Sequence, residues 1–174
     1  NLVSLYQSGV KKYADNPMFG VKNNEGEYEW VTFKEVGKRI DNFRAGLATL
    51  GVKKGDVVGG IFNNRVEYAV CCFGAYGLGA RWVPMYLKER TQVWKYIIND
   101  AGVKVLVVND KEVYEKIMEI KPELPNLEHV LIIESNEENS MAHLEAKGAE
   151  KPVEAIVPDK DDIACLIYTS GTTG

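Results

Sequence analysis

Residues 91–108 read T-Q-V-W-K-Y-I-I-N-D-A-G-V-K-V-L-V-V, an amphipathic segment followed directly by an apolar one. Trp94, Ile97, Ile98 and Ala101 recur at helical spacing on one side of the first segment, and Thr91 is the expected cap of that helix. Residues 103–108 are almost continuously apolar, as is typical of a strand that helices cover on both faces. This stretch therefore favours an α/β fold built from helix–strand units.

The same alternation continues in both directions from this stretch. Thr32 and Glu35 form a capping-box pattern that predicts a helix start, and Gly51 is the expected stop of that helix. Asn64 and Glu67 repeat the cap pattern before the next helix. The polar residues 136–150 are assigned to no element, and 134–140 is expected to be a surface loop. The expected strands are 18–21, 28–31, 56–62, 81–84, 103–108, 129–133 and 162–168, and the expected helices are 2–14, 32–50, 64–77, 91–101 and 111–120.

This order of elements predicts an open, mainly parallel α/β sheet flanked by helices, with right-handed crossovers. Sheets of this kind bind ligands beyond the carboxyl ends of their strands. A functional site is therefore expected in the loops that follow the strands.

Composition limits the function further. The 174 residues are 45% hydrophobic and 26% charged, with a formal net charge of -4, which argues against a nucleic-acid surface. The three cysteines suggest neither a disulfide framework nor a zinc site, so a reduced, cytoplasmic protein is expected. No apolar run reaches the roughly 20 residues of a membrane span, and the start lacks the apolar stretch of a secretory signal. Because the chain begins without Met and stops at Gly174, we expect it to be a piece of a longer protein.

The candidate functional site is the last stretch of the sequence, Thr169-Ser170-Gly171-Thr172-Thr173-Gly174, which follows the expected strand 162–168. Glycines allow a backbone to approach a ligand closely, and successive N–H groups can form an anion-binding nest. The hydroxyls add donors to phosphate oxygens, and one of them could reach a phosphate-bound Mg²⁺. A surface turn is the alternative that this composition leaves open. No lysine follows, so this is not a Walker-type loop.

Tyr168 to Gly174, Y-T-S-G-T-T-G, resembles the signature loop of the acyl-adenylate-forming (AMP-binding) superfamily, which contains acyl-CoA synthetases, adenylation domains of peptide synthetases and firefly luciferase. Residues 50–58 and 79–84 resemble the same superfamily. Val83-Pro84-Met85-Tyr86 is more similar to long-chain fatty acyl-CoA ligases than to amino-acid adenylation domains. The family motif continues with Pro-Lys-Gly-type residues, which this sequence does not contain.

The resemblance implies that residues 1–174 are the incomplete N-terminal part of the large domain of an adenylate-forming enzyme, with the rest of that domain and the C-terminal domain absent. The full-length enzyme would use ATP and Mg²⁺ to activate a long-chain fatty acid to acyl-AMP, and coenzyme A would then take the acyl group. Thr169 would be the Mg²⁺-associated hydroxyl, and Ser170, Gly171, Thr172, Thr173 and Gly174 would hold the β- and γ-phosphates. No catalytic residue is assigned, because the family's catalytic lysine lies further along, and the chain alone is expected to be inactive.

Several alternatives stay open. An aryl-CoA ligase or a luciferase-like enzyme would belong to the same superfamily. A P-loop-like phosphotransferase and a non-catalytic nucleotide-binding or interaction domain are the alternatives from other classes, because a fold alone does not fix a function. The expected partners are a carboxylic acid, ATP and CoA but no nucleic acid, while peripheral membrane association and a homodimer also stay open.

The remaining conspicuous side chains are better explained by packing or solvation than by chemistry. Free cysteines are commonly buried, and a tryptophan on a helix face is usually part of a core. The acidic residues beside Pro158 are expected to form the solvated start of the strand 162–168 rather than a metal site. Packing is accordingly expected for Cys71, Cys72, Cys165, Trp82, Tyr86 and Trp94, a surface or structural role for His129 and His143, and solvation for Asp159, Asp161 and Asp162.

Overall fold

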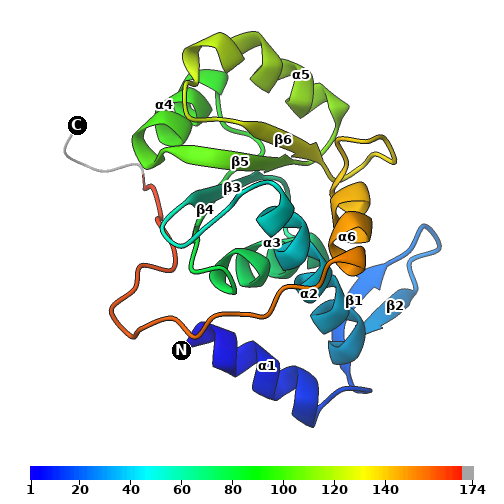
Figure 1. Ribbon diagram of the computed structural model, residues 1–174. Coiled ribbons are helices and arrows are strands. Elements are labelled where there is room, and N and C mark those ends of the chain that lie inside the picture. The colour runs from blue at the N-terminus through cyan, green and yellow to red at the C-terminus, as the bar shows by residue number, and fades with distance from the viewer. Residues whose placement is uncertain (170–174) are drawn as a thin grey trace.

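A four-stranded parallel sheet with helices on both faces forms the centre of the computed structural model, which describes residues 1–169 (Figure 1). An antiparallel hairpin projects from one side. The helices are α1 (Leu2–Lys12), α2 (Phe33–Thr49), α3 (Val66–Tyr76), α4 (Thr91–Ala101), α5 (Lys111–Ile120), the 3₁₀ turn η1 (Lys121–Glu123) and α6 (Met141–Glu150). The strands are β1 (Pro17–Lys22), β2 (Tyr28–Thr32), β3 (Val57–Ile61), β4 (Arg81–Met85), β5 (Val103–Val108) and β6 (His129–Ile132).

The strand order β4-β3-β5-β6 and its parallel pairing confirm the predicted fold class. The chain runs from β3 outward to β4 and then crosses back over β3 to β5. The carboxyl ends of β3 and β5 therefore form the point at which the order of the sheet reverses, the usual place for a ligand in such folds.

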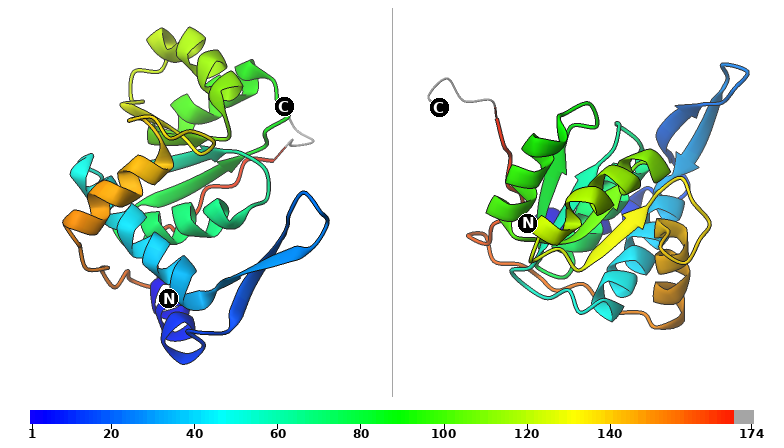
Figure 2. Two further views of the ribbon diagram at one scale, coloured as in Figure 1. Left: turned by 90° about the vertical axis from the view of Figure 1, so that its right-hand side faces the viewer. Right: turned by 90° about the horizontal axis from the view of Figure 1, so that it is seen from above.

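The core consists of two layers separated by the sheet. Val58, Val105 and Val107 face α2, α3 and α6, whereas Val57 and Leu106 face α4 and α5. Figure 2 shows these helices on both sides of the strands. Because both faces are covered, the strands need apolar side chains at successive positions, which explains the apolar runs in the sequence.

Helix starts were predicted with mixed success. The capping box of Thr32 and Glu35 is present at the start of α2, and Gly51 follows this helix with a φ of +75°, as expected for a stop. The prediction for Asn64 is wrong, because Arg65 is the N-terminal cap residue of α3 and makes no side-chain cap. Thr91 is the first residue of α4 rather than its cap.

Helix α6 was not predicted from the sequence. Ser140 caps it by accepting a hydrogen bond from the His143 N–H, and Met141 and Leu144 are buried. At Gly148 a Cβ would overlap the Asn42 carbonyl oxygen of α2, so the two helices cross at backbone contact. The helix is stabilised by this tertiary contact, which cannot be predicted from its polar sequence.

The strand predicted at 162–168 is wrong. This segment makes a single parallel bridge, from Cys165 to Trp82 on the outer side of β4. The Trp82 N–H donates to the Ala164 carbonyl at 2.8 Å, and the Leu166 N–H donates to the Trp82 carbonyl at 2.9 Å. Ile163 and Ile167 are exposed rather than buried, so the apolar run overstates the burial of this segment.

Candidate functional site

Thr169 is the one member of the predicted phosphate loop that the structure places. Its side chain is exposed at the end of the segment that bridges to β4. A threonine hydroxyl is a hard oxygen ligand, which fits the preference of Mg²⁺. The other predicted loop residues, Ser170, Gly171, Thr172, Thr173 and Gly174, lie outside the described residues.

Tyr168 attaches the chain to α4 immediately before Thr169. Its hydroxyl donates to Asp100 Oδ2 at 2.6 Å, and its ring meets the ring of Tyr96 edge-on, with centroids 6.3 Å apart. Burial, together with the hydrogen bond to Asp100, raises the pKa of Tyr168 to about 12, so the phenol keeps its proton at neutral pH. Asp100 was not singled out from the sequence, because nothing local links two residues 68 positions apart.

Trp82 forms the second attachment of this segment. Its ring is buried and contacts Phe62 and Tyr68, and a Cβ at Gly60 would overlap it. Within residues 1–169, its Nε1 has no hydrogen-bond partner. The segment leading to Thr169 therefore rests on a rigid aromatic layer on one side and on α4 on the other.

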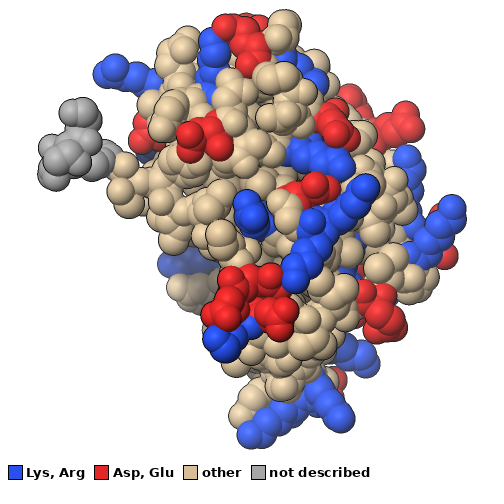
Figure 3. Space-filling view, turned by 60° about the vertical axis from the view of Figure 1, so that its left-hand side comes forward, with Lys and Arg blue, Asp and Glu red and all other residues tan. Residues whose placement is uncertain are grey.

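The surface beside this end of the chain is mixed. In Figure 3, uncharged atoms lie directly next to the grey residues, and acidic and basic side chains lie close by.

A charged cluster fills the switch point between β3 and β5. Arg65 Nη1 donates to Glu134 Oε1 at 2.7 Å and to Asn109 Oδ1 at 3.3 Å, and Arg65 Nε donates to Glu67 Oε2 at 2.8 Å. Asn109 is buried and also donates to Asp110 at 2.9 Å. Because these groups pair with one another, the cluster connects the loops that follow β3, β5 and β6.

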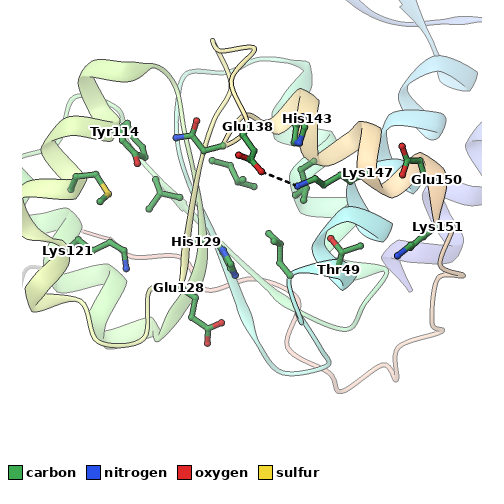
Figure 4. Close-up of a pocket in the computed structure, with 16 residues that line it drawn as sticks. Thr49, Tyr114, Lys121, Glu128, His129, Glu138, His143, Lys147, Glu150 and Lys151 are labelled. Carbon is green, nitrogen blue, oxygen red and sulfur yellow. Dashed lines mark ion pairs between the residues drawn. The ribbon is translucent and has the colours of Figure 1, made fainter.

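An open groove of about 740 Å³ lies between α5, β6 and α6 (Figure 4). Lys147 pairs loosely with Glu138 at 3.9 Å, and Lys121 donates to the Leu127 carbonyl at 2.6 Å. His129 and His143 line the groove and are half-buried, which agrees with the structural role predicted for them. Since β6 and the segment before Thr169 lie at opposite edges of the sheet, this groove is separate from the predicted phosphate loop.

The predicted solvation is confirmed for Asp159 and Asp161, which are exposed, whereas Asp162 is partly buried. Asp162 pairs with Lys54 at 2.7 Å and accepts a hydrogen bond from the Asp159 N–H at 2.8 Å. Across residues 1–169, no three His, Cys, Asp or Glu side chains gather into a cluster suited to a metal ion.

The packing roles predicted for most of the other side chains are confirmed. Cys71 and Cys72 are buried, which raises the pKa of both thiols, that of Cys72 to about 12. Cys165 is half-buried against the core, and Trp82 and Trp94 are buried. The prediction for Tyr86 is wrong, because its ring is exposed while its carbonyl accepts from Trp94 Nε1 at 2.9 Å.

None of the helices in the described part of the chain has the length and apolarity needed to cross a membrane.

Comparison with known proteins gives a match to the family described as AMP-binding enzyme over residues 6–174. Long chain acyl-CoA synthetase 8 of Arabidopsis thaliana is 24% identical over 98% of this chain and 28% of its own length. Long-chain-fatty-acid--CoA ligase FadD15 of Mycobacterium bovis is 30% identical over 86% of this chain and 26% of its own length.

Among solved structures, the anthranilate CoA ligase AuaEII in complex with anthranoyl-AMP is similar, with a TM-score of 0.83 and 26% identity. The match covers 100% of this chain and 32% of that one. The chain therefore spans between about a quarter and a third of the length of these three proteins.

Proposed function

The chain belongs to the AMP-binding enzyme family, and on that premise we propose that it supplies the polyphosphate-binding loop of an ATP-dependent acid–CoA ligase. The observation that carries the proposal is the sequence Y-T-S-G-T-T-G at 168–174. It follows a segment that is attached to β4 through Cys165 and to α4 through Tyr168. A carboxylate would attack the α-phosphate of ATP, forming acyl-AMP and releasing pyrophosphate. The coenzyme A thiol would then attack the acyl carbon and release AMP.

The proposed loop has to hold a polyanion while a second anion, the carboxylate, approaches it. Backbone N–H groups and hydroxyls aimed at the phosphate oxygens reduce this repulsion because they are already oriented before the reaction. Thr169 is the proposed Mg²⁺-associated hydroxyl, and Ser170 to Gly174 are the proposed contacts to the β- and γ-phosphates. A bound Mg²⁺ would add positive charge next to the phosphates.

A long-chain fatty acid is the proposed substrate. Two relatives whose names specify long-chain substrates support this choice, as does the Val83-Pro84-Met85-Tyr86 sequence at the end of β4. An aryl acid is the second candidate, favoured by the similarity to the anthranilate CoA ligase. We further propose a cytoplasmic location, consistent with three free cysteines in the described chain.

The test is substrate-dependent exchange of labelled pyrophosphate into ATP, measured on the complete gene product with fatty and aryl acids. Thr169→Val replaces the hydroxyl with a methyl group of similar size and should lower exchange at least about tenfold, because the proposed Mg²⁺-associated oxygen is lost and the metal stabilises charge in the transition state. Ser8→Ala removes an exposed hydroxyl on α1 and should leave exchange unchanged. Full exchange in Thr169→Val would refute the role of this hydroxyl.

We also propose that the 174-residue chain alone catalyses no exchange, because it contains none of the adenine, ribose or catalytic-lysine positions of the family. The same assay on the isolated chain checks this. Measurable turnover would show that the active site lies elsewhere.

A further inference from the structure

The segment that leads to the candidate phosphate loop has little main-chain pairing. Trp82 on β4 accepts a hydrogen bond from the Leu166 N–H at 2.9 Å and donates one to the Ala164 carbonyl at 2.8 Å. Within residues 1–169, the backbone groups of 167–169 make no hydrogen bond to another backbone group. Main-chain pairing therefore fixes this segment only as far as Leu166.

Pro84 explains why the pairing with β4 stops there. The hydrogen bonds of a parallel ladder recur two residues further along each strand, so the next donor to the Leu166 carbonyl would be the N–H of residue 84. Residue 84 lies inside β4, but it is a proline and has no N–H. β4 therefore cannot donate the next hydrogen bond, and the segment needs a different attachment beyond Leu166.

Tyr168 supplies this attachment through its side chain. Its hydroxyl donates to Asp100 Oδ2, and its ring packs edge-on against Tyr96. Tyr96 and Asp100 are four residues apart on α4, so both side chains lie on the same face of that helix. Figure 1 shows the end of the described chain beside α4. Because Thr169 is the next residue, the contact with α4 fixes the point at which the loop begins.

The place of Asp100 in α4 is not explained by the stability of the helix. Asp100 is the second-last residue of α4, where the negative end of the helix dipole disfavours a carboxylate. Within residues 1–169, its side chain makes no ion pair with Lys or Arg, and its one hydrogen bond comes from Tyr168. A carboxylate that is unfavourable for its own helix and has this one partner points to a role in holding that partner.

We propose that Asp100 is a positioning residue for the polyphosphate-binding loop and acts on the loop through Tyr168. This inference rests on the function proposed for residues 169–174. The hydrogen bond holds the residue before Thr169 in place, so that the N–H groups and hydroxyls of the loop are already oriented when ATP binds. The raised pKa of Tyr168 keeps its hydroxyl protonated at neutral pH, so the donor of this bond is always present.

The β- and γ-phosphates are the part of the nucleotide whose binding should depend on Asp100. In the complete gene product, Asp100→Ala should weaken binding of the Mg²⁺ complex of AMP-PNP, a non-hydrolysable ATP analogue, about fivefold in isothermal titration calorimetry. Binding of AMP, which lacks both phosphates, should change by less than about twofold. A variant that was merely misfolded would lose affinity for both ligands.

Conservative variants test whether Asp100 acts through Tyr168. Asp100→Asn keeps an oxygen that can accept from the Tyr168 hydroxyl, so it should retain most of the affinity for AMP-PNP. Tyr168→Phe keeps the ring but loses the donor, and it should weaken AMP-PNP binding as much as Asp100→Ala does. Because both changes break the same hydrogen bond, the double variant should bind no more weakly than either single variant.

Two control variants match these changes elsewhere in the chain. Glu119→Ala removes an exposed carboxylate from the second-last residue of α5, the position that corresponds to Asp100 in α4. Tyr13→Phe removes the hydroxyl of an exposed tyrosine next to α1. Both variants should bind AMP-PNP as the parent does, and circular dichroism confirms that every variant is folded.

Three results would overturn the positioning role: full AMP-PNP affinity in Asp100→Ala, an equal loss of affinity for AMP and AMP-PNP, or additive losses in the double variant. Acid-dependent pyrophosphate exchange by the parent is measured in parallel. If the parent binds AMP-PNP with the expected losses in the variants but exchanges no pyrophosphate with any acid, the ligase function is refuted and the positioning role is supported. A parent that binds no AMP-PNP would refute both.

Discussion

Thr32 and Glu35 connect the hairpin to the start of α2 through reciprocal hydrogen bonds. The Thr32 N–H and hydroxyl donate to Glu35 Oε2 at 2.8 and 2.7 Å, and the Glu35 N–H donates to Thr32 Oγ1 at 3.3 Å. We expect Thr32→Ala to lower the free energy of unfolding by about 1 kcal/mol in urea denaturation, because a lost cap typically costs that much. Ser8→Ala, at an exposed position within α1, should change the free energy of unfolding by no more than about 0.5 kcal/mol.

The same cap predicts a pH dependence. Hydrogen bonds from the Thr32 backbone and then from its side chain lower the pKa of Glu35 below its ordinary value of 4.5. The stabilisation by the Glu35 carboxylate is therefore fully present above about pH 4.5 and is lost as the pH falls through the lowered pKa. The difference in the free energy of unfolding between the parent and Glu35→Gln should shrink as the pH falls through this pKa. A difference that does not change with pH would contradict the assignment.

The buried thiols should resist modification in the native protein. Burial raises the pKa of Cys71 and Cys72, so the reactive thiolate is scarce and inaccessible. At pH 8, Ellman's reagent should label neither cysteine until denaturant is added, after which all three thiols react. Cys165→Ser isolates the two buried thiols, and rapid labelling of this variant in buffer would contradict their placement.

Residue-scale features were predictable where they depend on neighbours in the sequence. The box formed by Thr32 and Glu35 spans four residues, so its spacing alone indicated it. The contact between Tyr168 and Asp100 joins residues that only the fold brings together. The assignment of Asn64 failed because the preceding turn places Arg65, paired with Glu67, at the start of α3.

Helices α2 and α6 cross at a pair of glycines, Gly46 and Gly148. Gly46 lies against Leu144, and at Gly148 a Cβ would overlap backbone atoms of α2. We expect Gly148→Ala to destabilise the protein by about 2 kcal/mol, although alanine favours a helix by about 1 kcal/mol, because overpacking forces the helices apart. Ala149→Gly, at an exposed position, should cost about 1 kcal/mol through propensity alone. If Gly148→Ala were more stable than the parent, the contact between α2 and α6 would be able to accommodate a Cβ without strain.

Arg39 joins three helices through its guanidinium. It donates to Glu145 on α6 at 3.0 and 3.2 Å and to Glu67 on α3 at 3.0 Å. Because Arg39 is about one third exposed, we expect Arg39→Ala to cost about 2 kcal/mol, less than for a fully buried pair. A double-mutant cycle with Glu145→Ala should give a coupling energy above about 0.5 kcal/mol, and additive effects would contradict the pairing.

The stability deficit of Arg39→Ala should also depend on pH. Burial raises the pKa of Glu145, and Arg39 opposes that rise. Without Arg39 the pKa should rise further, so the buried carboxylate destabilises the variant most at neutral and high pH. Protonation removes this penalty, and the deficit should therefore narrow as the pH falls towards 5. A stability deficit of Arg39→Ala that becomes larger at low pH would contradict this prediction.

Elements with a covered apolar face were predictable, and those defined by tertiary contact were not. The runs at 57–61 and 103–108 become the two central strands because both faces of the sheet are covered. The segment 162–168 has a similar composition, yet Ile163 and Ile167 are exposed and only Cys165 bridges to β4. Helix α6 was missed for the opposite reason, since its few apolar residues are enough once Gly148 contacts α2.

At the scale of the whole molecule, the two core layers share the same sheet and should unfold together. Trp82 reports on the layer beneath α2 and α3, and Trp94 on the layer beneath α4 and α5. We expect Trp30→Phe/Trp82→Phe and Trp30→Phe/Trp94→Phe each to show emission and far-ultraviolet circular dichroism curves with one common midpoint in urea. Separate midpoints within either variant would show that the two layers unfold independently.

The fold class followed from the sequence, but the strand order and the surface features did not. Apolar runs alternating with helices limited the choice to parallel sheets, without showing that β4 and β5 lie on either side of β3. The groove beside β6 and the close contact between Trp30 and Gly20 depend on pairings across the structure. The phosphate loop remains a prediction from its motif, since Ser170 to Gly174 lie outside the described residues.

The parallel pairing of β3, β4, β5 and β6 also bears on the order of events during folding. Each of these pairings needs a helix-length loop to close first, whereas the β1–β2 hairpin closes across a few residues. Loop closure delays the non-local contacts, so the hairpin should form within microseconds and the sheet much later. A nascent chain would therefore display Tyr28 and Trp30 on a finished hairpin before any of its core strands had met.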